Sequence, residues 1–128
     1  MEESNKQIKT FRDLIVWQKS MNLVTDMYKL SKSFPSDETY GLMLQIRRCV
    51  ISIPSNIAEG YGRATTSEYI RFFRIATGSL YELQTQVEIA LNLGYMDKSE
   101  FDTFYELTRE LERLLSSLTK KLLERRSQ

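Results

Sequence analysis

The sequence predicts an all-α protein, an antiparallel up-down-up-down four-helix bundle with a proline-kinked second helix. Apolar residues recur at three- and four-residue spacings through four long stretches, which is the period of an amphipathic helix. The chain has only two prolines and five glycines, and most of them stand between these stretches. No alternation of polar and apolar residues predicts a strand, and 128 residues can bury one core but not two. Short connections make neighbouring helices antiparallel.

The first helix is predicted to begin at Thr10, because Thr10 and Asp13 resemble a capping box, and to end near Pro35. The residues before it are polar. We therefore expect a flexible N-terminal segment over residues 1–9 and a single bundle domain over residues 10–126. The apolar face of this helix is formed by Leu14, Trp17, Met21, Val24 and Tyr28.

The second helix is predicted to be capped by Ser36 or Asp37 and to stop at Gly60. Pro54 interrupts it, and a proline costs about 3 kcal/mol inside an ordinary helix, so we expect a kink. Its core-facing residues are Leu42, Ile46, Cys49, Val50, Ile53 and Ile57. Three further apolar residues lie on a different side of the helix from this face: Leu44, Ile51 and Ala58. Either neighbouring helices of the same chain or a second subunit must cover them.

The third helix is predicted to start after Thr65 and to end at Gly94, and the fourth starts after Asp97 and keeps a seven-residue repeat up to a basic C-terminal end. Their apolar faces are formed by Phe73, Ala76, Leu80, Leu83, Val87 and Leu91, and by Phe104, Leu107, Leu111, Leu114, Leu118 and Leu122. Gly78 lies inside the third helix, where glycine costs about 1 kcal/mol relative to alanine. We therefore expect another helix to approach closely there, beside the predicted kink.

A narrow polar stripe follows the second helix, formed by Gln45, Arg48, Ser52, Asn56, Glu59 and Arg63. Serine and asparagine are poor residues for a helix interior, so these groups are expected to hydrogen-bond something specific. One interpretation is a structural polar network that fixes the second helix against the third, comprising Gln45, Ser52, Asn56, Glu59, Ser79 and Glu82. The other is a lining that holds a ligand. We favour the network.

Arginines and aromatic residues alternate around the connection between the second and third predicted helices. This composition is typical of surfaces that bind nucleic acid. The candidate binding residues are Arg47, Arg48, Arg63, Arg71 and Arg74. The net charge is only +1, but the charges are segregated, since residues 81–115 carry three basic and eight acidic side chains. Such segregation suits either a basic strip on a neutral protein or charge-steered self-association.

The composition disfavours catalysis. The chain has no histidine and one cysteine, so the commonest neutral-pH base and the usual thiolate or zinc sites are missing, and we expect no catalytic residue, metal or cofactor. An enzyme using Glu59 with Arg48 and Asn56 is a third hypothesis, but a lone carboxylate specifies no reaction. No signal peptide or membrane-spanning run is present, so a cytoplasmic protein without membrane contact is expected.

The combined pattern resembles a known family, the bacterial four-helix bundle proteins related to the one encoded by 23S ribosomal RNA intervening sequences. The residues that carry the resemblance are the run from Leu14 to Gln18, the SIPSNIAEGYGR segment from Ser52 to Arg63, the run from Ala76 to Leu83, and Leu93-Gly94-Tyr95. The Asn-Ile-Ala-Glu-Gly run after a serine-proline pair is the most specific of these.

The resemblance implies a subunit that assembles into a ring-like homopentamer. The same family includes the accessory protein of diversity-generating retroelements, which works beside a reverse transcriptase and binds nucleic acid through a basic surface. Our leading hypothesis is therefore a non-enzymatic oligomeric adaptor that binds RNA, DNA or a nucleic-acid enzyme through the five arginines. The alternative is a protein–protein interaction module with no nucleic-acid contact, in which the acidic residues 81–115 form the binding face.

Overall fold

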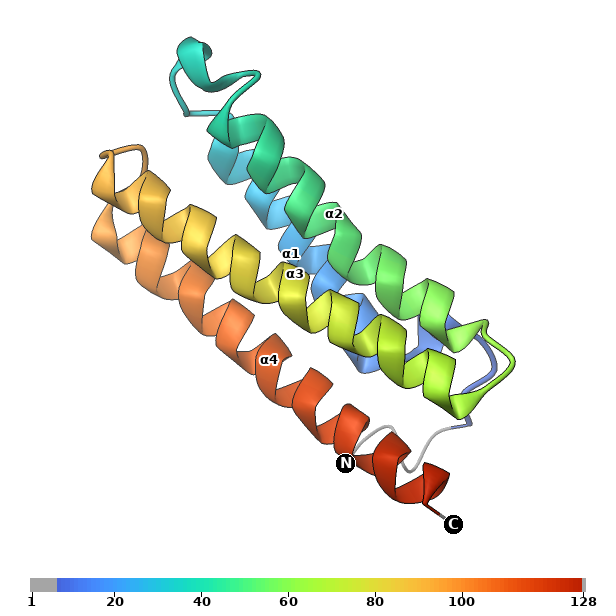
Figure 1. The fold of residues 1–128 in the computed structure, drawn as a ribbon. Coiled ribbons are helices and arrows are strands. Elements are labelled where there is room, and N and C mark those ends of the chain that lie inside the picture. Colours follow the sequence, from blue (N-terminus) through green and yellow to red (C-terminus); the bar gives the residue numbers. More distant parts are fainter. Residues whose placement is uncertain (1–6, 128) are drawn as a thin grey trace.

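The computed structural model describes residues 7–127 and contains four long helices and no strand in that range. The all-α four-helix bundle predicted from the sequence is confirmed. Figure 1 shows successive helices running in opposite directions. The elements are η2 (Phe11–Asp13), α1 (Ile15–Ser31), η3 (Ser36–Glu38), α2 (Leu42–Tyr61), α3 (Thr66–Asn92) and α4 (Lys98–Arg126).

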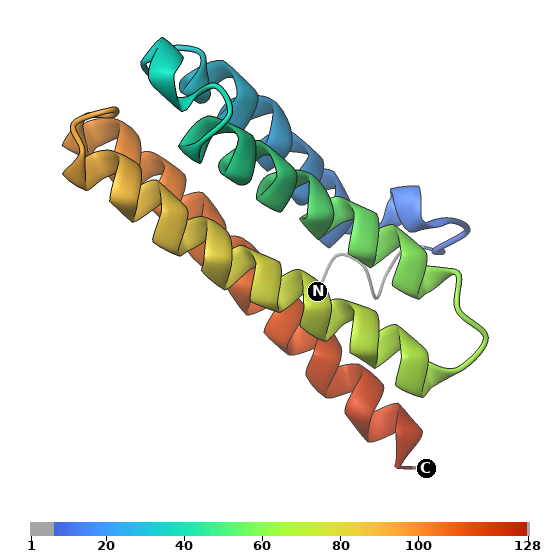
Figure 2. The ribbon, with the colours of Figure 1, turned by 45° about the horizontal axis from the view of Figure 1, so that its top comes forward.

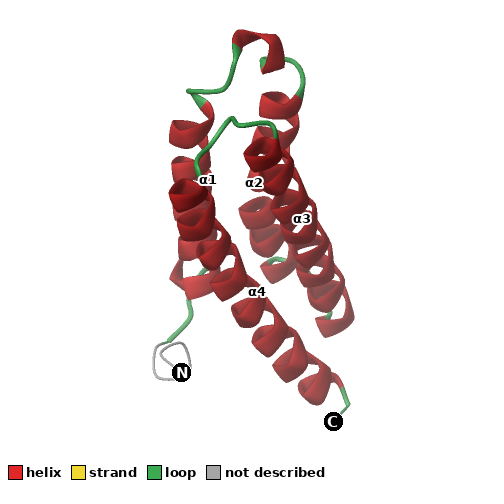
Figure 3. Cartoon of the chain, turned by 90° about the vertical axis from the view of Figure 1, so that its left-hand side faces the viewer, coloured by secondary structure: helices red, strands yellow, loops and turns green. Residues whose placement is uncertain are grey.

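The helices form a square in which each packs against its two neighbours in the chain order α1, α2, α3, α4 and back to α1. The closest packing is between α2 and α3, and the loosest is between α1 and α4. Figure 3 shows α1 and α3 separated across the bundle. The side formed by α1 and α2 is therefore opposite the side formed by α3 and α4, and both sides are open to solvent.

The core lies along the inner faces of all four helices. Its fully buried side chains include Ile46, Ile53 and Ile57 of α2 and Leu80 and Leu83 of α3, each with no exposed surface. Burial of each such side chain contributes about 1.5–3 kcal/mol. The apolar periodicity of the sequence thus placed the core of α2 correctly.

Helix α2 continues through Pro54 without a break, and the proline ring is buried. A proline has no N–H, so the carbonyl of Val50 loses its usual partner in the helix. The expectation of one helix rather than two is therefore met, while the kink at Pro54 stays a prediction.

Two of the four predicted N-termini are displaced. The capping box of Thr10 and Asp13 is present, but it closes the short η2 turn, and α1 begins only at Ile15. The predicted cap at Ser36 or Asp37 is wrong, because these residues form η3 and α2 begins at Leu42. The reason is the backbone of Gly41, whose φ of −109° and ψ of −118° interrupt the helical path.

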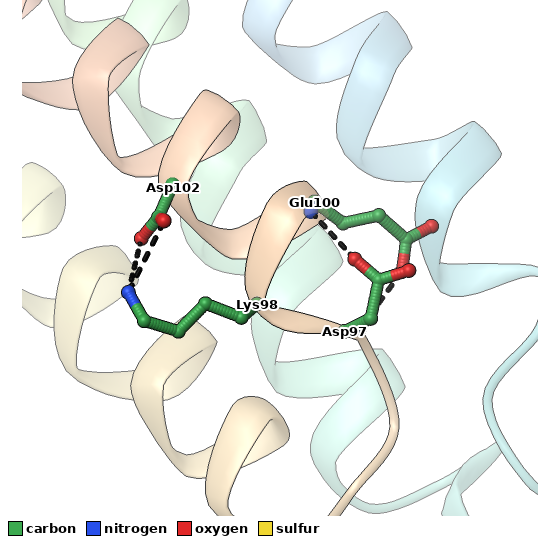
Figure 4. Close-up of polar contacts among 4 residues, drawn as sticks. All are labelled: Asp97, Lys98, Glu100 and Asp102. Carbon is green, nitrogen blue, oxygen red and sulfur yellow. Dashed lines mark hydrogen bonds and ion pairs between the residues drawn. The ribbon is translucent and has the colours of Figure 1, made fainter.

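The start of α4 is capped as the sequence predicts. The Asp97 carboxylate accepts from the backbone N–H of Glu100 at 2.7 Å, and the Glu100 carboxylate accepts from the N–H of Asp97 at 3.0 Å (Figure 4). Lys98 and Asp102 add an ion pair of 2.9 Å one turn apart. A cap of this kind contributes about 1 kcal/mol. Thr65 caps α3 in the same manner by accepting from the N–H of Glu68.

The end of the bundle near Gly94 is fastened by Glu38. Its carboxylate accepts from the backbone N–H of Leu42 at 2.9 Å and from the hydroxyl of Tyr95 at 2.7 Å. The Tyr95 ring also lies 5.4 Å from that of Phe34. Gly94 has a φ of +80°, the left-handed conformation that ends α3 and that other residues rarely adopt. One carboxylate therefore links the α1–α2 connection to the α3–α4 turn.

We expect the free energy of unfolding to depend on pH through Glu38. The N–H of Leu42, and then the Tyr95 hydroxyl, hold the pKa of this carboxyl below its ordinary value of 4.5. The stabilisation is therefore complete above that value and is lost as the pH falls through the lowered pKa. In Glu38→Gln the melting temperature should be lower than that of the wild type at pH 7, and the gap should close on acidification. Asp37→Asn is the matched control, and a gap for Glu38→Gln that ignores pH would contradict the assignment.

The flexible N-terminal segment predicted for residues 1–9 lies mostly outside the described residues. Within it, Ile8 packs against the core, and the N–H of Lys9 donates to the Asp13 carboxylate at 2.9 Å. In residues 7–127 no helix combines the length and the hydropathy that crossing a membrane requires.

Candidate nucleic-acid interface

Arg47 points into the bundle rather than onto a binding surface. Its Nε donates to the Ser31 hydroxyl at 2.9 Å, and its Nη2 donates to the carbonyl of Tyr28 at 3.2 Å. The guanidinium carbon lies 4.5 Å from the centre of the Tyr28 ring. Ser31 is fully buried, so this arginine holds the C-terminal end of α1 against α2.

Arg63 and Arg71 share one aromatic partner. Their guanidinium carbons lie 4.6 and 5.5 Å from the centre of the Phe72 ring, and Arg63 also forms an ion pair of 3.3 Å with Glu59. Both arginines are exposed, so the cation–π contacts order them without removing their charge from solvent. The structure thus brings Arg63 and Arg71 together at the turn between α2 and α3.

Two basic segments that are distant in sequence meet at this same end of the bundle. Residues 63–80 carry three basic and one acidic side chain, and residues 113–126 carry five and one. Figures 1 and 2 show the C-terminal part of α4 (red) alongside the start of α3 (green). Arg126 even reaches the Ser67 hydroxyl at 3.5 Å. Residues 81–112 surround the opposite turn and carry two basic and eight acidic side chains. The net charge of +1 therefore conceals a basic end and an acidic end.

Arg74 lies three residues beyond Arg71 on α3 and lines a groove between α3 and α4. This α3/α4 groove has a volume of about 820 Å³, and its lining includes Arg74, Gly78 and Tyr81 of α3 and Arg113, Ser116 and Lys120 of α4. All six are exposed. Sequence reasoning missed Arg113 and Lys120, because only the pairing of α4 with α3 brings them opposite Arg74. The signal was their seven-residue spacing, which places both on one face of the fourth helix.

Arg48 is exposed on α2. The remaining side chains of the predicted polar stripe bond locally. The Ser52 hydroxyl donates to the carbonyl of Cys49 at 2.6 Å, and the Asn56 amide donates to the carbonyl of Ser52 at 2.7 Å. The lone carboxylate of the enzyme hypothesis, Glu59, is paired with Arg63.

Across residues 7–127, no hydrogen bond joins two of the six side chains assigned to the network. On α3, Glu82 accepts from Gln86 at 3.3 Å. The contact between α2 and α3 at this level comes from Cys49, whose thiol donates to the carbonyl of Ser79 at 3.0 Å. Burial, together with the nearby Glu82 carboxylate, raises the pKa of this thiol to about 12. The cysteine is therefore a protonated packing residue at neutral pH.

The close approach of two helices occurs at Gly60 and not at Gly78, so that prediction is wrong. A Cβ on Gly60 would lie 2.7 Å from the Cβ of Phe72, whereas a Cβ on Gly78 would meet nothing within 4 Å. An interior glycine is compatible with a close helix contact or with an exposed backbone, and the sequence does not distinguish the two. From the sequence, Gly60 is predicted only to end the second helix. Gly78 instead leaves the backbone of α3 open to solvent on the α3/α4 groove.

An apolar groove lies on the opposite side of the bundle, between α1 and α2. Its lining includes Met21 and Ile51, which remain 41% and 42% exposed, together with Trp17, Val24 and Ala58. Its volume is about 330 Å³. The apolar arc that the sequence placed on the second helix is thus left partly uncovered by the described part of the chain. We call this surface the α1/α2 face.

The fold agrees with the comparisons with known proteins. The model of a family described as 23S rRNA-intervening sequence protein matches residues 12–117. The chain belongs to this family.

The match to the 23S rRNA-intervening sequence protein family spans α1, α2 and α3 and most of α4. A solved structure has the same fold: a protein of unknown function from the S23 ribosomal protein family, from Bacteroides thetaiotaomicron. It is 22% identical, has a TM-score of 0.77, and the alignment covers 83% of this chain and 99% of that one. Comparison with curated proteins gives no match.

Proposed function

We propose that this member of the 23S rRNA-intervening sequence protein family is a non-enzymatic, self-associating adaptor that binds nucleic acid through the basic end of the bundle. The observation that carries the proposal is the meeting of residues 63–80 and 113–126 at one end, with eight acidic side chains gathered toward the other. A polyanion is attracted to local positive potential rather than to net charge. The near-neutral total is therefore no obstacle to binding.

The assembly is proposed from two separate apolar patches. One is the α1/α2 face, and the other is marked by two separate exposed side chains of α3, Ile75 and Ile89, which are 40% and 43% exposed. The two isoleucines are 14 residues apart and lie on one side of their helix. A ring in which each subunit contacts the next head to tail needs two different patches on each subunit. The two surfaces of this subunit support the ring-like pentamer that the family resemblance implies, because they supply one contact surface for each neighbour.

Affinity for nucleic acid should fall steeply with salt. We expect a fluorescent 20-nucleotide RNA or DNA strand to bind at low salt, with a logarithmic slope of about −0.7 per phosphate contact. The double variant Arg63→Gln/Arg71→Gln should bind more weakly and with a shallower slope, whereas Lys29→Gln/Lys32→Gln removes two charges at the acidic end and should change little. Binding that is absent at low salt, or that ignores salt, would remove the electrostatic mechanism.

The mass in solution tests the assembly. At micromolar concentration we expect about five times the subunit mass, and Ile51→Glu should shift the protein to smaller species because it places a charge in the α1/α2 face. Leu107→Glu is the matched control, since Leu107 is 39% exposed but belongs neither to the α1/α2 face nor to the exposed isoleucines of α3. A wild-type protein that is strictly monomeric would contradict self-association.

The acidic end favours a second candidate, a protein–protein module with no nucleic-acid contact. In that case a basic partner would bind near residues 81–112, and the Arg63→Gln/Arg71→Gln variant would retain it. Partner capture that survives nuclease treatment, in a protein that binds no oligonucleotide, would support this candidate over the first.

A further inference from the structure

We propose that the α3/α4 groove is the binding site for a single nucleic-acid strand. Arg74, Arg113 and Lys120 would contact its phosphates, and a base would stack on Tyr81. This inference rests on the proposed function and adds to it a site, a strand state and a base contact. The residues of this site are different from Arg63 and Arg71, the two arginines that contact the Phe72 ring.

The charges of the groove are available to a polyanion. Arg74, Arg113 and Lys120 are exposed, and within the described part of the chain none of them forms an ion pair. The one carboxylate in the lining, Glu112, is already occupied: it pairs with Arg109 at 3.4 Å and accepts from Gln84 at 3.3 Å. The groove therefore offers three cations whose counter-ions would be released on binding phosphate.

The remaining lining carries an aromatic ring and hydroxyl groups, which a nucleotide strand can use. Tyr81 is 51% exposed and supplies an aromatic face on which any base can stack. Hydroxyl groups of α4, those of Ser116 and Thr119, can donate to phosphate and sugar oxygens.

Gly78 gives the groove its depth. No atom lies within 4 Å of where its Cβ would be, so nothing inside the subunit requires glycine at this position. Glycine is unfavourable inside a helix, yet here it leaves the backbone of α3 open between Arg74 and Tyr81. An occupant that approaches the backbone closely accounts for the residue. The groove lies between two helices of one subunit, which suits one strand rather than a duplex.

The test measures binding of fluorescein-labelled oligo(dT) and oligo(U) to the full chain, by anisotropy across a salt series. Arg113→Gln and Lys120→Gln should each weaken binding severalfold and make the logarithmic salt slope shallower by about 0.7. Tyr81→Ala should weaken binding at least fivefold and leave the slope unchanged, because stacking releases no counter-ion. Gly78→Gln should weaken binding without changing any charge, and its thermal melt should show that the fold is intact.

Matched controls lie outside the groove. Lys29→Gln removes an exposed charge from α1 at the opposite end of the bundle, and Tyr40→Ala removes a tyrosine that is 88% exposed at that end; both should bind as the wild type does. Binding of oligonucleotide that survives all groove variants but is lost in Arg63→Gln/Arg71→Gln would overturn the groove and keep the proposed function. A wild-type chain that binds no strand would overturn both. A duplex that competes as well as the single strand, with the same dependence on Tyr81, would overturn the single-strand assignment.

Discussion

Arg47→Ala should destabilise the fold by about 2–4 kcal/mol, although the sequence placed this residue on a binding surface. The substitution removes two charge-assisted hydrogen bonds to α1, each of about 1.5–3 kcal/mol before the freed groups find water, and a cation–π contact of about 0.5–1 kcal/mol. It also leaves the buried hydroxyl of Ser31 without the Arg47 guanidinium. Urea denaturation followed by circular dichroism at fixed protein concentration measures the loss.

Arg48→Ala is the control for this experiment, because it removes the same side chain from the next position on the helix. Arg48 is exposed on the outer side of α2, so the free energy of unfolding should change by less than about 0.5 kcal/mol. Equal losses for Arg47→Ala and Arg48→Ala would contradict the structural role of Arg47. A loss of oligonucleotide affinity in a still-folded Arg47→Ala protein would return the residue to the binding surface.

Gly60→Ala and Gly78→Ala should change stability in opposite directions. At Gly60 the new methyl would meet the Cβ of Phe72 at 2.7 Å, and a Cβ cannot move without its backbone, so α2 and α3 must separate. Overpacking of this kind costs up to about 3 kcal/mol, of which the better helix propensity of alanine recovers about 1 kcal/mol. We therefore expect a net loss of about 2 kcal/mol.

At Gly78 the new methyl enters open space, so only the propensity gain of about 1 kcal/mol remains and the melting temperature should rise. The comparison is internal, since both substitutions are glycine to alanine inside a helix. Stabilisation by Gly60→Ala would show that α2 and α3 are not tightly apposed there. Destabilisation by Gly78→Ala would show that the backbone at this position is not free.

Periodicity was enough to predict the four helices and the core of α2, because burial of apolar side chains repeats along a helix and is therefore written in the local sequence. The starts of α3 and α4 could also be predicted from nearby residues, because Thr65 and Asp97 accept hydrogen bonds from the first turn of their own helices. The start of α2 was not: Glu38 caps it from a separate turn and is itself held by Tyr95, 57 residues away.

The candidate site could be predicted only in part, for the same reason. Arg63 and Arg71 meet because a short turn joins their helices, which the sequence reveals. The orientation of Arg47 toward α1, and the alignment of Arg113 and Lys120 with Arg74, depend on which helix packs beside which. Composition around a turn identifies a basic region but cannot separate an arginine that fastens two helices from one that faces solvent.

Opposite charge at the two ends of an elongated bundle also gives the subunit a permanent electric dipole along its length. A rod polarised in this way turns in the field of a polyanion before touching it, so that most encounters would begin at the basic end. In a ring whose subunits all point the same way, these dipoles would add. One rim would then attract nucleic acid and the other would repel it, which confines each assembly to one strand-bearing side.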